Sequence, residues 1–462
     1  MPRTMTWALG GLLTLVGTTA RADGPAPTYH REISRLLQKH CQDCHRPGQV
    51  GPFSLMNYEQ ARKRAVDLVR VTEDRRMPPW PADPHYGGPF QDQRVMSPAE
   101  TAVLKAWVES GCLEGDNADA PKPRAFASEW PLGRPDLVLT MDEAYELEAE
   151  GNDDFRVFVL KTDLPEDKYI RAVDFKPGNR TVVHHILAGV DTSGRARQLD
   201  AADPKPGYYS ISFGDGVPMR NFLPFWTPGT RPRQAPEGAG YVLPKGGDVL
   251  LQIHYHKSGK VEKDATSIGL YFSDKPLTRR VDIGVVFPAM PMDKVIGALK
   301  KVKEDRKAGR KMDMDEMLKS FLEIPAGEGR YEVKGSTGNM FMGGPLSRDV
   351  LVTAVVPHMH WLGTDFVMKA VLPNGGGEIP LIKIDHWDFN WQGSYVLEKP
   401  VRVPKGAWFE MVAHFDNTDS NPVNPQRPAR TVYWGNQTND EMCLGVYEFV
   451  LPEDGPTASE GR

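Results

Sequence analysis

The chain is poor in cysteine, in long apolar runs and in surplus charge of either sign. Among its 462 residues there are four cysteines, and the formal net charge is only -5. Because acidic and basic residues are interspersed, the sequence lacks the basic footprint of a nucleic-acid-binding protein, and we expect no nucleic-acid partner. Beyond the first residues, no stretch approaches the ~20 apolar residues of a transmembrane helix. The sequence therefore predicts no membrane span in the mature chain.

The first residues have the pattern of a secretory signal peptide. Arg3 precedes an apolar run over residues 7–16, and Ala20-Arg21-Ala22 supplies the small residues of a cleavage site. We expect residues 1–22 to be a signal peptide, so the mature protein would be periplasmic or secreted. An uncleaved N-terminal anchor is the alternative.

The four cysteines divide into one closely spaced pair and two single residues. Cys41-Gln-Asp-Cys44-His45 has the spacing by which haem is covalently attached to a c-type cytochrome, with the histidine as iron ligand. It predicts one haem c, which is attached outside the cytoplasm and so agrees with export. Cys112 and Cys443 lie far apart in sequence, and we expect free thiols, with a bridge between them as the alternative.

Residues 24–115 predict a small all-α cytochrome c domain around the haem motif. One helix, with its apolar residues on one face, leads into Cys41. A later helix is marked at its start by Ser97 and Glu100, which form a capping box, and at its end by Gly111.

The sixth iron ligand is predicted in the loop between these helices. Met77 stands at the start of Met-Pro-Pro-Trp, and a thioether in a proline-stiffened loop would stabilise ferrous iron and raise the haem potential. Met56, Met96 and His85 compete for this role. Packing of Met77 against the haem without ligation is a further alternative.

The rest of the chain is expected to be β-structure. A linker rich in Pro, Ala and Asp occupies residues 116–133, and 40 prolines and 44 glycines indicate many turns. A lysine-rich stretch with helical apolar spacing then interrupts the β pattern. We predict all-β sandwiches at residues 134–290 and 331–452, separated by a helical connector at residues 291–330. Strands are predicted at residues 136–140, 155–160, 181–190 and 249–256.

Histidine is concentrated in the second half of the chain. Eight of the twelve histidines lie beyond residue 180, and six of those eight form three tight pairs. Imidazole suits several transition metals, whereas the thioether of a following methionine favours Cu(I) over zinc or iron(II). The set therefore predicts copper. A zinc hydrolase on the same histidines is disfavoured, because no His-Glu-x-x-His motif is present. The residues are His184-His185, His254-Tyr-His256, His358-Met-His360 and Met442.

Strand geometry limits which of these histidines can share a metal. His358 and His360 point to the same face of an extended strand and can chelate one ion. Adjacent His184 and His185 point to opposite faces, so joint ligation requires a bulge or a strand end. The alternative for this second pair is one buried and one exposed histidine without a metal.

Four segments in a fixed order resemble the copper type II, ascorbate-dependent monooxygenases, the family of peptidylglycine α-hydroxylating monooxygenase and dopamine β-monooxygenase. The resemblance covers about residues 134–450. It implies two jelly-roll-like β-sandwiches that each hold one copper and face each other across a solvent-filled cleft. The segments are Thr181-Val-Val-His-His-Ile-Leu187, Gly238 to Tyr255, Pro357-His-Met-His-Trp-Leu-Gly363 and Asn439-Asp-Glu-Met-Cys443.

Carried over by position, the resemblance assigns a role to each metal ligand. A first copper, which relays electrons, would be held by His184, His185 and His254. A second copper, where O2 binds, would be held by the catalytic residues His358, His360 and Met442. We favour a surface position for His256, with ligation as the alternative.

The resemblance departs from the family at the substrate. Where the peptide-processing member binds a peptide carboxylate, this chain has Val356, Leu444 and Val446, none of which can pair with a carboxylate. Peptidylglycine is therefore disfavoured, and an apolar pocket wall is the simpler interpretation.

The sequence as a whole predicts an exported monooxygenase that uses two coppers and one haem c. It would insert one oxygen atom from O2 into a C–H bond of an unidentified substrate. The fused cytochrome would deliver electrons from an external donor, either a redox protein or a small reductant. The alternative is a copper-binding or electron-transfer protein without oxygenase activity.

Overall fold

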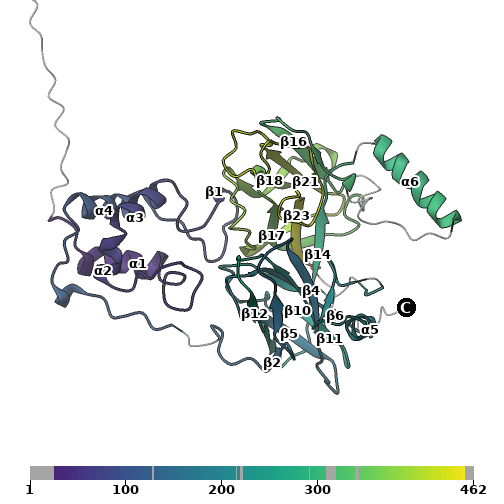
Figure 1. Ribbon diagram of the computed structural model, residues 1–462, viewed down its shortest axis with the longest axis horizontal. Helices are drawn as coiled ribbons and strands as arrows, with labels where there is room; N and C mark the ends of the chain where they lie inside the picture. Colours follow the sequence, from purple (N-terminus) through teal and green to yellow (C-terminus); the bar gives the residue numbers. More distant parts are fainter. Residues whose placement is uncertain are drawn as a thin grey trace, which may run out of the picture.

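The computed structural model describes residues 25–126, 130–214, 216–218, 222–290, 292–308, 319–338 and 343–452. The expected signal peptide lies outside these residues. A small helical unit lies beside a larger β-rich body, from which a single helix projects (Figure 1). Among the described residues, no helix has both the length and the apolar character needed to cross a membrane.

The helical unit contains the helices expected on both sides of the haem motif. Its elements are η1 (Tyr29–Ile33), α1 (Ser34–His40), α2 (Tyr58–Lys63), α3 (Ala65–Glu73), α4 (Pro98–Glu109) and the short η2 (Asn117–Asp119). The capping box of α4 is confirmed: the Glu100 N–H donates to Ser97 Oγ over 3.2 Å, and the Ser97 N–H donates to Glu100 Oε2 over 2.8 Å. Ile33 and Trp107, both fully buried, belong to one core that joins these helices.

The prediction that residues 24–115 form an all-α unit is wrong. Strand β1 (Ala82–Gly87) lies between α3 and α4 and pairs antiparallel with β19 (Glu378–Ile384), in the C-terminal part of the chain. Ala82 and Phe90 are buried in the core of that part. The physical reason is that β19 would otherwise be a sheet edge with unpaired backbone groups, and β1 covers it.

The first half of the β-rich body is a two-layer sandwich. One layer has the strand order β7-β4-β11-β6-β8, and the other contains β2-β13-β5-β10. Side chains of both layers share one hydrophobic core. The elements are β2 (Leu137–Thr140), β3 (Tyr145–Leu147), β4 (Asp154–Leu160), β5 (Lys168–Lys176), β6 (Val183–Asp191), α5 (Arg195–Ala202), β7 (Tyr208–Tyr209), β8 (Phe222–Trp226), β9 (Arg233–Gln234), β10 (Ala239–Leu243), β11 (Asp248–Tyr255), β12 (Glu262–Asp264) and β13 (Ser267–Phe272).

The second half is a sandwich of the same kind. A layer ordered β1-β19-β18-β21-β16 packs on a layer containing β14-β23-β17-β20. The remaining elements are β14 (Arg279–Val286), α6 (Met292–Lys307), β15 (Glu323–Ile324), β16 (Tyr331–Ser336), β17 (Val350–Met359), β18 (Gly363–Val371), η4 (Pro373–Gly375), β20 (Tyr395–Val403), β21 (Trp408–Phe415), β22 (Val432–Tyr433) and β23 (Cys443–Val450).

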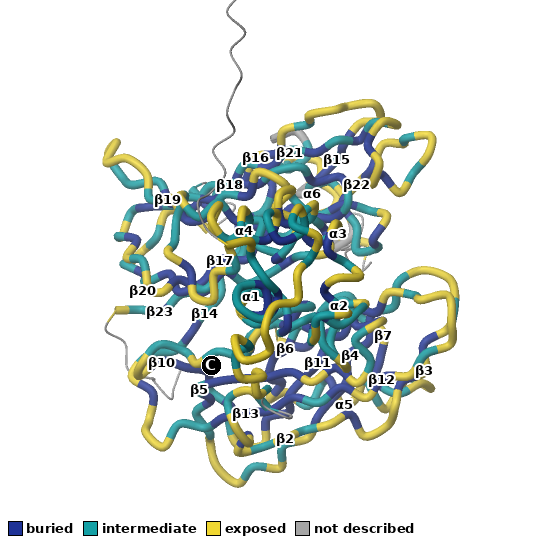
Figure 2. The backbone as a smooth tube through the Cα atoms, turned by 90° about the vertical axis from the view of Figure 1, so that its left-hand side faces the viewer, coloured by how far each residue is buried: buried dark blue, intermediate teal, exposed yellow. Residues whose placement is uncertain are grey.

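The two halves are joined through β14. This strand pairs along residues 281–286 with β23 of the second half, and through Arg279 and Arg280 with β10 of the first. A single nine-stranded sheet therefore runs through both sandwiches. The predicted boundary at residue 290 lies after β14, although β14 pairs with β23 and so belongs to the sheet of the second half. The strands are mostly buried and the connecting loops mostly exposed (Figure 2).

The predicted connector helix is present as α6. It projects from the second half (Figure 1), and the last part of the stretch with helical spacing, residues 309–318, lies outside the described residues. Cys112 and Cys443 are both free thiols, as expected.

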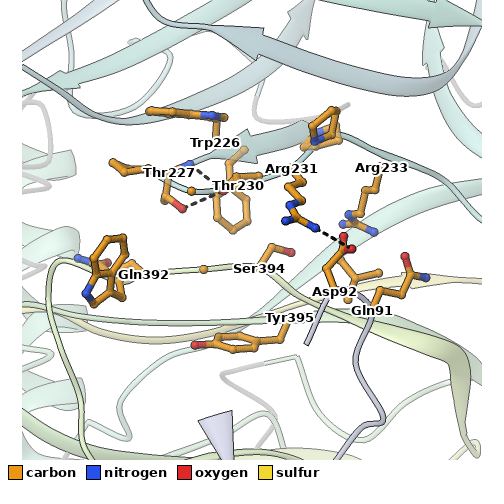
Figure 3. Close-up of a pocket in the computed structure, with 18 of the residues that line it drawn as sticks. Gln91, Asp92, Trp226, Thr227, Thr230, Arg231, Arg233, Gln392, Ser394 and Tyr395 are labelled. Atoms are coloured by element: carbon orange, nitrogen blue, oxygen red, sulfur yellow. Dashed lines mark hydrogen bonds and ion pairs between the residues drawn. The ribbon is translucent and has the colours of Figure 1, made fainter. Parts of the chain in front are cut away.

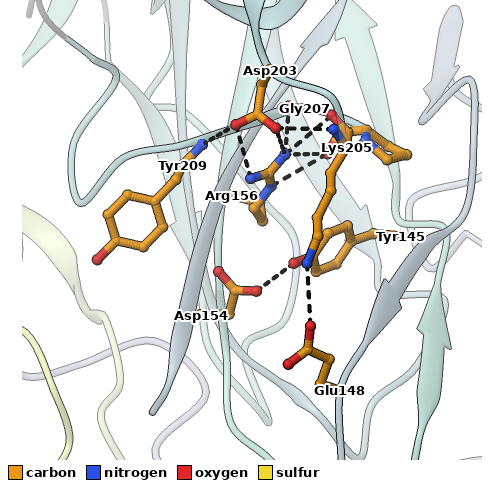
Figure 4. Close-up of polar contacts among 9 residues, drawn as sticks. Tyr145, Glu148, Asp154, Arg156, Asp203, Lys205, Gly207 and Tyr209 are labelled. Carbon is orange, nitrogen blue, oxygen red and sulfur yellow. Dashed lines mark hydrogen bonds and ion pairs between the residues drawn. The ribbon is translucent and has the colours of Figure 1, made fainter. Parts of the chain in front are cut away.

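A buried arginine fastens the loop after α5 to the first sandwich. Arg156 on β4 is 4% exposed, and its guanidinium donates to the carbonyl oxygens of Lys205, Pro206 and Gly207 and to the Asp203 carboxylate (Figure 4). A buried cation is stable only when its donors are satisfied in this way. This contact fixes the end of β4 that adjoins the histidines described below, because the neighbouring Phe155 is opposite His254.

Candidate metal centres

Three of the predicted ligands converge at the edge of the first sandwich. His184 and His185 lie on β6 and His254 lies on the neighbouring β11. His185 Nδ1 is 3.3 Å from His184 Nδ1 and 3.4 Å from His254 Nδ1, and possible ligand atoms of all three lie within 4.8 Å of one another. Three ring nitrogens at this separation can hold one metal ion.

A β-bulge brings the two adjacent histidines to the same side. His254 is opposite His185, but the next residue, Tyr255, is opposite Val183, so that His184 is the extra residue on β6. An extra residue interrupts the alternation of side chains between the two faces. The bulge that joint ligation required is therefore present.

The environment of these three imidazoles favours their neutral form. Burial lowers the pKa of His184 and of His185 well below the usual value, and the neighbouring histidines lower both further. Burial also lowers the pKa of His254, although its hydrogen bond to Asp153 acts in the opposite direction. Neutral imidazole is the form that binds a metal, so binding here requires little proton release.

Asp153 orients His254 and was not recognised from the sequence. The Nε2–H of His254 donates to Asp153 Oδ2 over 3.1 Å, which leaves His254 Nδ1 free to face His185. Oδ1 accepts from the Nδ1 of His256, whose side chain is 54% exposed and lies outside the convergent group. Burial alone would raise the pKa of Asp153, but its histidine partners hold that pKa well below the usual range. A carboxylate on the far nitrogen of a histidine fixes its tautomer and ring orientation.

Asp153 also connects the first histidine set to the second sandwich. Its Oδ2 accepts from the backbone N–H of Thr438 over 3.1 Å and from the Thr438 hydroxyl. Thr438 lies four residues before Met442. One carboxylate therefore contacts both a candidate ligand of the first set and the loop that carries Met442.

The second set of predicted ligands lies on two paired strands. In the register of β17 and β23, Met359 is opposite Cys443 and His358 is opposite Leu444, so the next step of this register brings His360 opposite Met442. His358, His360 and Met442 therefore share one face, because side chains alternate along a strand. Met359 points to the other face and packs in the core.

Both imidazoles of the second set are oriented through Nδ1. His358 Nδ1 donates to the Gln392 side-chain oxygen, and His360 Nδ1 donates to the carbonyl oxygen of Asp440 over 3.0 Å. Because each Nδ1 is occupied by its hydrogen bond, each Nε2 points away from the bonded oxygen and remains available as a ligand atom. Burial lowers the pKa of His358 to about 4 and that of His360 to about 3, so both rings are neutral at pH 7.

Glu441 joins the segments that carry His360 and Met442. Its buried carboxylate accepts the backbone N–H of His360, of Leu362 over 2.9 Å and of Met442 over 2.8 Å. Burial raises the pKa of Glu441 to about 8, although the three N–H donors act in the opposite direction. The sequence placed this residue in a motif but gave no indication of its contacts.

The two histidine sets contact each other. The ring centroids of His185 and His358 lie 6.4 Å apart. Phe389 stacks on His184 at 4.9 Å between centroids and also lies 5.7 Å from His360. The expectation of a solvent-filled cleft between the two sites is wrong, because His185 contacts His358 directly and Phe389 packs against a histidine of each set. Phe389 and Gln392 come from one loop in which the sequence offered no metal-site signal.

The three residues that depart from the peptide-binding pattern lie beside the second set. Val356 is opposite Val446 and His358 is opposite Leu444 in the same register. All three therefore lie on the strand face of the candidate ligands. The surface next to His358 is apolar, as the sequence indicated.

A family model described as "Copper type II ascorbate-dependent monooxygenase, C-terminal domain" matches residues 310–449. These residues therefore carry a copper type II monooxygenase C-terminal domain. The matched stretch contains His358, His360 and Met442, whereas the first histidine set and the helical unit lie outside it. A search of curated proteins gives no match to the chain.

Solved structures show only distant likeness to this chain. The VP2 subviral particle of infectious bursal disease virus is 9% identical over 68% of this chain and 71% of that chain, with a TM-score of 0.18. PNGF-II is 11% identical over 69% of this chain and 66% of that chain, with a TM-score of 0.26. At these scores the likeness supports no conclusion about function.

The predicted haem residues are grouped at the end of α1. Cys41 ends the helix, and the N–H groups of Cys44 and His45 both donate to the Cys41 carbonyl oxygen, over 3.2 and 2.9 Å. His45 Nδ1 donates to the Phe53 carbonyl oxygen over 3.0 Å, which leaves Nε2 for a metal. Met77 lies just after α3, and its backbone N–H donates to the carbonyl oxygen of Val71 over 3.0 Å. Two free thiols and an oriented imidazole are the groups that covalent attachment of haem uses.

Replacing Asp153 with alanine is expected to weaken copper binding at the first set by about 10- to 100-fold, the usual effect of losing a hydrogen-bond partner of a ligating histidine. The measurement is competition for Cu(I) against a chromogenic chelator. Asp154→Asn is the matched control, because it removes an adjacent carboxylate that contacts Tyr145 and no histidine. Thr438→Val keeps the bond to His254 and should leave first-set affinity unchanged. Equal affinities in Asp153→Ala and Asp154→Asn would contradict the role of Asp153.

Proposed function

We propose that this protein is an exported copper-dependent monooxygenase that hydroxylates a C–H bond with O2. The observation that carries the proposal is the position of six candidate ligands, three on each sandwich, in a chain whose residues 310–449 match the copper type II family. Bound copper would supply one-electron redox chemistry and activation of O2, with one oxygen atom entering the substrate and the other leaving as water. That balance requires two electrons from an external donor.

The two ligand sets have different chemical tasks in this proposal. Three imidazoles at His184, His185 and His254 support both oxidation states of copper, as an electron relay requires. Two imidazoles and the thioether of Met442 favour Cu(I) and leave coordination positions open. Glu441 and Gln392 hold these second-set ligands in place, while Phe389 packs against a histidine of each set.

The substrate is proposed to lie against the apolar strand face beside His358. Val356, Leu444 and Val446 offer contacts to a hydrocarbon and none to a charged group. Apolar walls with few polar groups are typical of small-molecule sites. The reacting C–H bond would be oriented there by shape rather than by an ion pair.

The haem motif is proposed to supply the electrons. Asp43, between the two haem cysteines, forms an ion pair with Arg231 of the first sandwich, and Arg231 also contacts Asp92 at 3.2 Å. A haem at Cys41 and Cys44 would therefore be attached to the sandwiches through a fixed contact. A small redox protein or reductant would reduce this haem from outside, in the periplasm or after secretion.

The proposal is tested by counting metals and following haem oxidation in one preparation. The secreted chain is exposed to copper and zinc together, and two coppers per haem iron are expected. The reduced haem should reoxidise faster with copper, O2 and substrate than without copper. The Cys41→Ala/Cys44→Ala chain is the control for haem, and should bind two coppers but consume reductant slowly. Zinc at these sites, or at most one copper per chain, would contradict the proposal.

A further inference from the structure

A cavity of about 100 Å³ lies where the helical unit meets both sandwiches, and it is called the junction cavity below. Most of its lining comes from three segments: residues 79–94 before α4, residues 224–233 around β8 and β9, and residues 391–396 at the start of β20. Residues 173–175 of β5 and Glu448 of β23 complete it. Figure 3 shows Thr227, Thr230 and Arg231 on one side and Gln392, Ser394 and Tyr395 on the other. No predicted site residue lines this cavity, although Gln392 also binds His358.

Three buried polar atoms of this cavity have no hydrogen-bond partner in the part of the chain that the structure describes. They are Trp80 Nε1, Arg94 Nε and Ser394 Oγ. Five such atoms occur among the described residues, and three of the five line this one cavity. Buried polar groups without partners are costly, so a cluster of them at one cavity favours the binding of a polar ligand there.

Among the described residues that line the cavity, Arg94 and Asp174 are charged groups with no ion pair. Burial raises the pKa of Asp174 to about 6, which weakens its negative charge. Arg233 is paired with Glu448, and Arg231 with Asp43 and Asp92. Arg94 donates from Nη2 to the carbonyl oxygen of Gly229 over 2.6 Å, and no ion pair of its guanidinium occurs among the described residues. Burial lowers the pKa of Arg94, which means that its charge is poorly solvated here. A poorly solvated cation of this kind is stabilised by an anion.

We propose that the junction cavity binds a carboxylate group, held by Arg94, Trp80 and Ser394. The indole and guanidinium N–H groups can only donate hydrogen bonds, so a partner of either must be an acceptor. A carboxylate accepts several hydrogen bonds and neutralises Arg94, which water cannot do. Trp226, Tyr395 and the prolines of residues 79–81 form the apolar part of the wall.

Two sources can supply this carboxylate. Arg94 lies close enough to Cys44 for the charge of that thiol to affect its pKa, so a carboxylate side chain of a haem attached there could reach the cavity. The other source is a free small organic acid. The recognition chemistry is the same in both cases, and the inference does not depend on the hydroxylation reaction.

The test is the binding of trifluoroacetate, followed by ¹⁹F NMR, to two forms of the full-length chain. One form is the protein as secreted, and the other is the Cys41→Ala/Cys44→Ala chain without haem. Trifluoroacetamide, which has the same shape without charge, is the matched ligand control. Arg94→Gln is expected to weaken trifluoroacetate binding tenfold or more, because it removes a charge-assisted hydrogen bond. Ser394→Ala, a smaller change that keeps the wall intact, should weaken binding severalfold.

Arg124→Gln is the matched protein control. Arg124 pairs with Asp43 at 2.7 Å, so this change removes a positive charge beside the same haem motif but outside the cavity. If trifluoroacetate binds only to the haem-free form, and this binding depends on Arg94, a haem carboxylate occupies the cavity in the secreted form. If trifluoroacetate binds to both forms and depends on Arg94 in each, the cavity takes a free acid. Binding to neither form, or equal weakening by Arg94→Gln and Arg124→Gln, overturns the proposal. Copper content and product formation do not enter this measurement, so a failed hydroxylation assay leaves the result intact.

Discussion

Replacing Met442 with histidine is expected to leave two coppers bound and to lower product formation about a thousandfold, equivalent to about 4 kcal/mol of activation free energy. Met442 shares a strand face with His358 and His360, so a third imidazole would keep a ligand in place. It would also remove the soft thioether and with it the preference for Cu(I). The measurements are copper per chain, the Cu(II)/Cu(I) potential followed by electron paramagnetic resonance, and product formed from any compound that supports O2 uptake by the wild-type chain.

Met359→Leu is the matched control for this prediction. Met359 adjoins both second-set histidines in sequence, but its side chain is fully buried in the core on the other face of β17. A change of methionine to leucine that conserves volume usually costs little stability. An unchanged copper potential in Met442→His would show that Met442 is not a ligand. Unchanged product formation would favour a protein that stores copper or transfers electrons.

Replacing Glu441 with alanine is expected to lower the free energy of unfolding by about 3–9 kcal/mol and to abolish the second copper site. The carboxylate is 0% exposed and accepts three backbone N–H groups, which the change would leave without an acceptor. Each unsatisfied buried group costs about 1–3 kcal/mol. Since a domain is stable by only about 5–15 kcal/mol, this loss is large. Urea unfolding of the metal-free chain and copper counting provide the two measurements.

Two control variants separate the anchoring role of Glu441 from its charge. Asp440→Asn changes the adjacent carboxylate, which accepts the Gln437 N–H, and leaves the three anchored N–H groups untouched. Glu441→Gln retains one acceptor oxygen and should lie between wild type and Glu441→Ala. First-set copper should remain in every variant, because Asp153 and the three first-set histidines do not contact Glu441. If Glu441→Ala kept both coppers and its stability, the proposed anchoring of His360 and Met442 would be wrong.

Several interactions between the two sandwiches hold the two histidine sets in contact. Asp153 joins the first set to Thr438, Phe389 packs between His184 and His360, and β14 connects the two sheets. Each link uses residues that are far apart in the sequence. The same applies to the junction cavity, where Trp80, Arg94 and Ser394 come from two segments separated by about three hundred residues.

Local patterns were sufficient for several features. The capping box at Ser97 depends on residues three positions apart, and the common face of His358 and His360 depends only on the two-residue period of a strand. Strands β4, β6 and β11 also lie where apolar runs between turn residues predicted them. These features are set by neighbouring residues, so the sequence alone determines them.

Tertiary contacts decided the features that the sequence could not indicate. Whether His184 joins His185 depends on a bulge, and a bulge is defined only against the partner strand β11. The predicted all-α unit contains strand β1 because β1 pairs with the open edge of β19, about three hundred residues away in the sequence. Asp153, Gln392 and Phe389 lie in loops with no metal-binding pattern and acquire their roles through the histidines they contact. The sequence by itself therefore determined which residues can bind copper, whereas the packing of the two sandwiches decided how those residues are oriented, how close the two sets lie and what separates them.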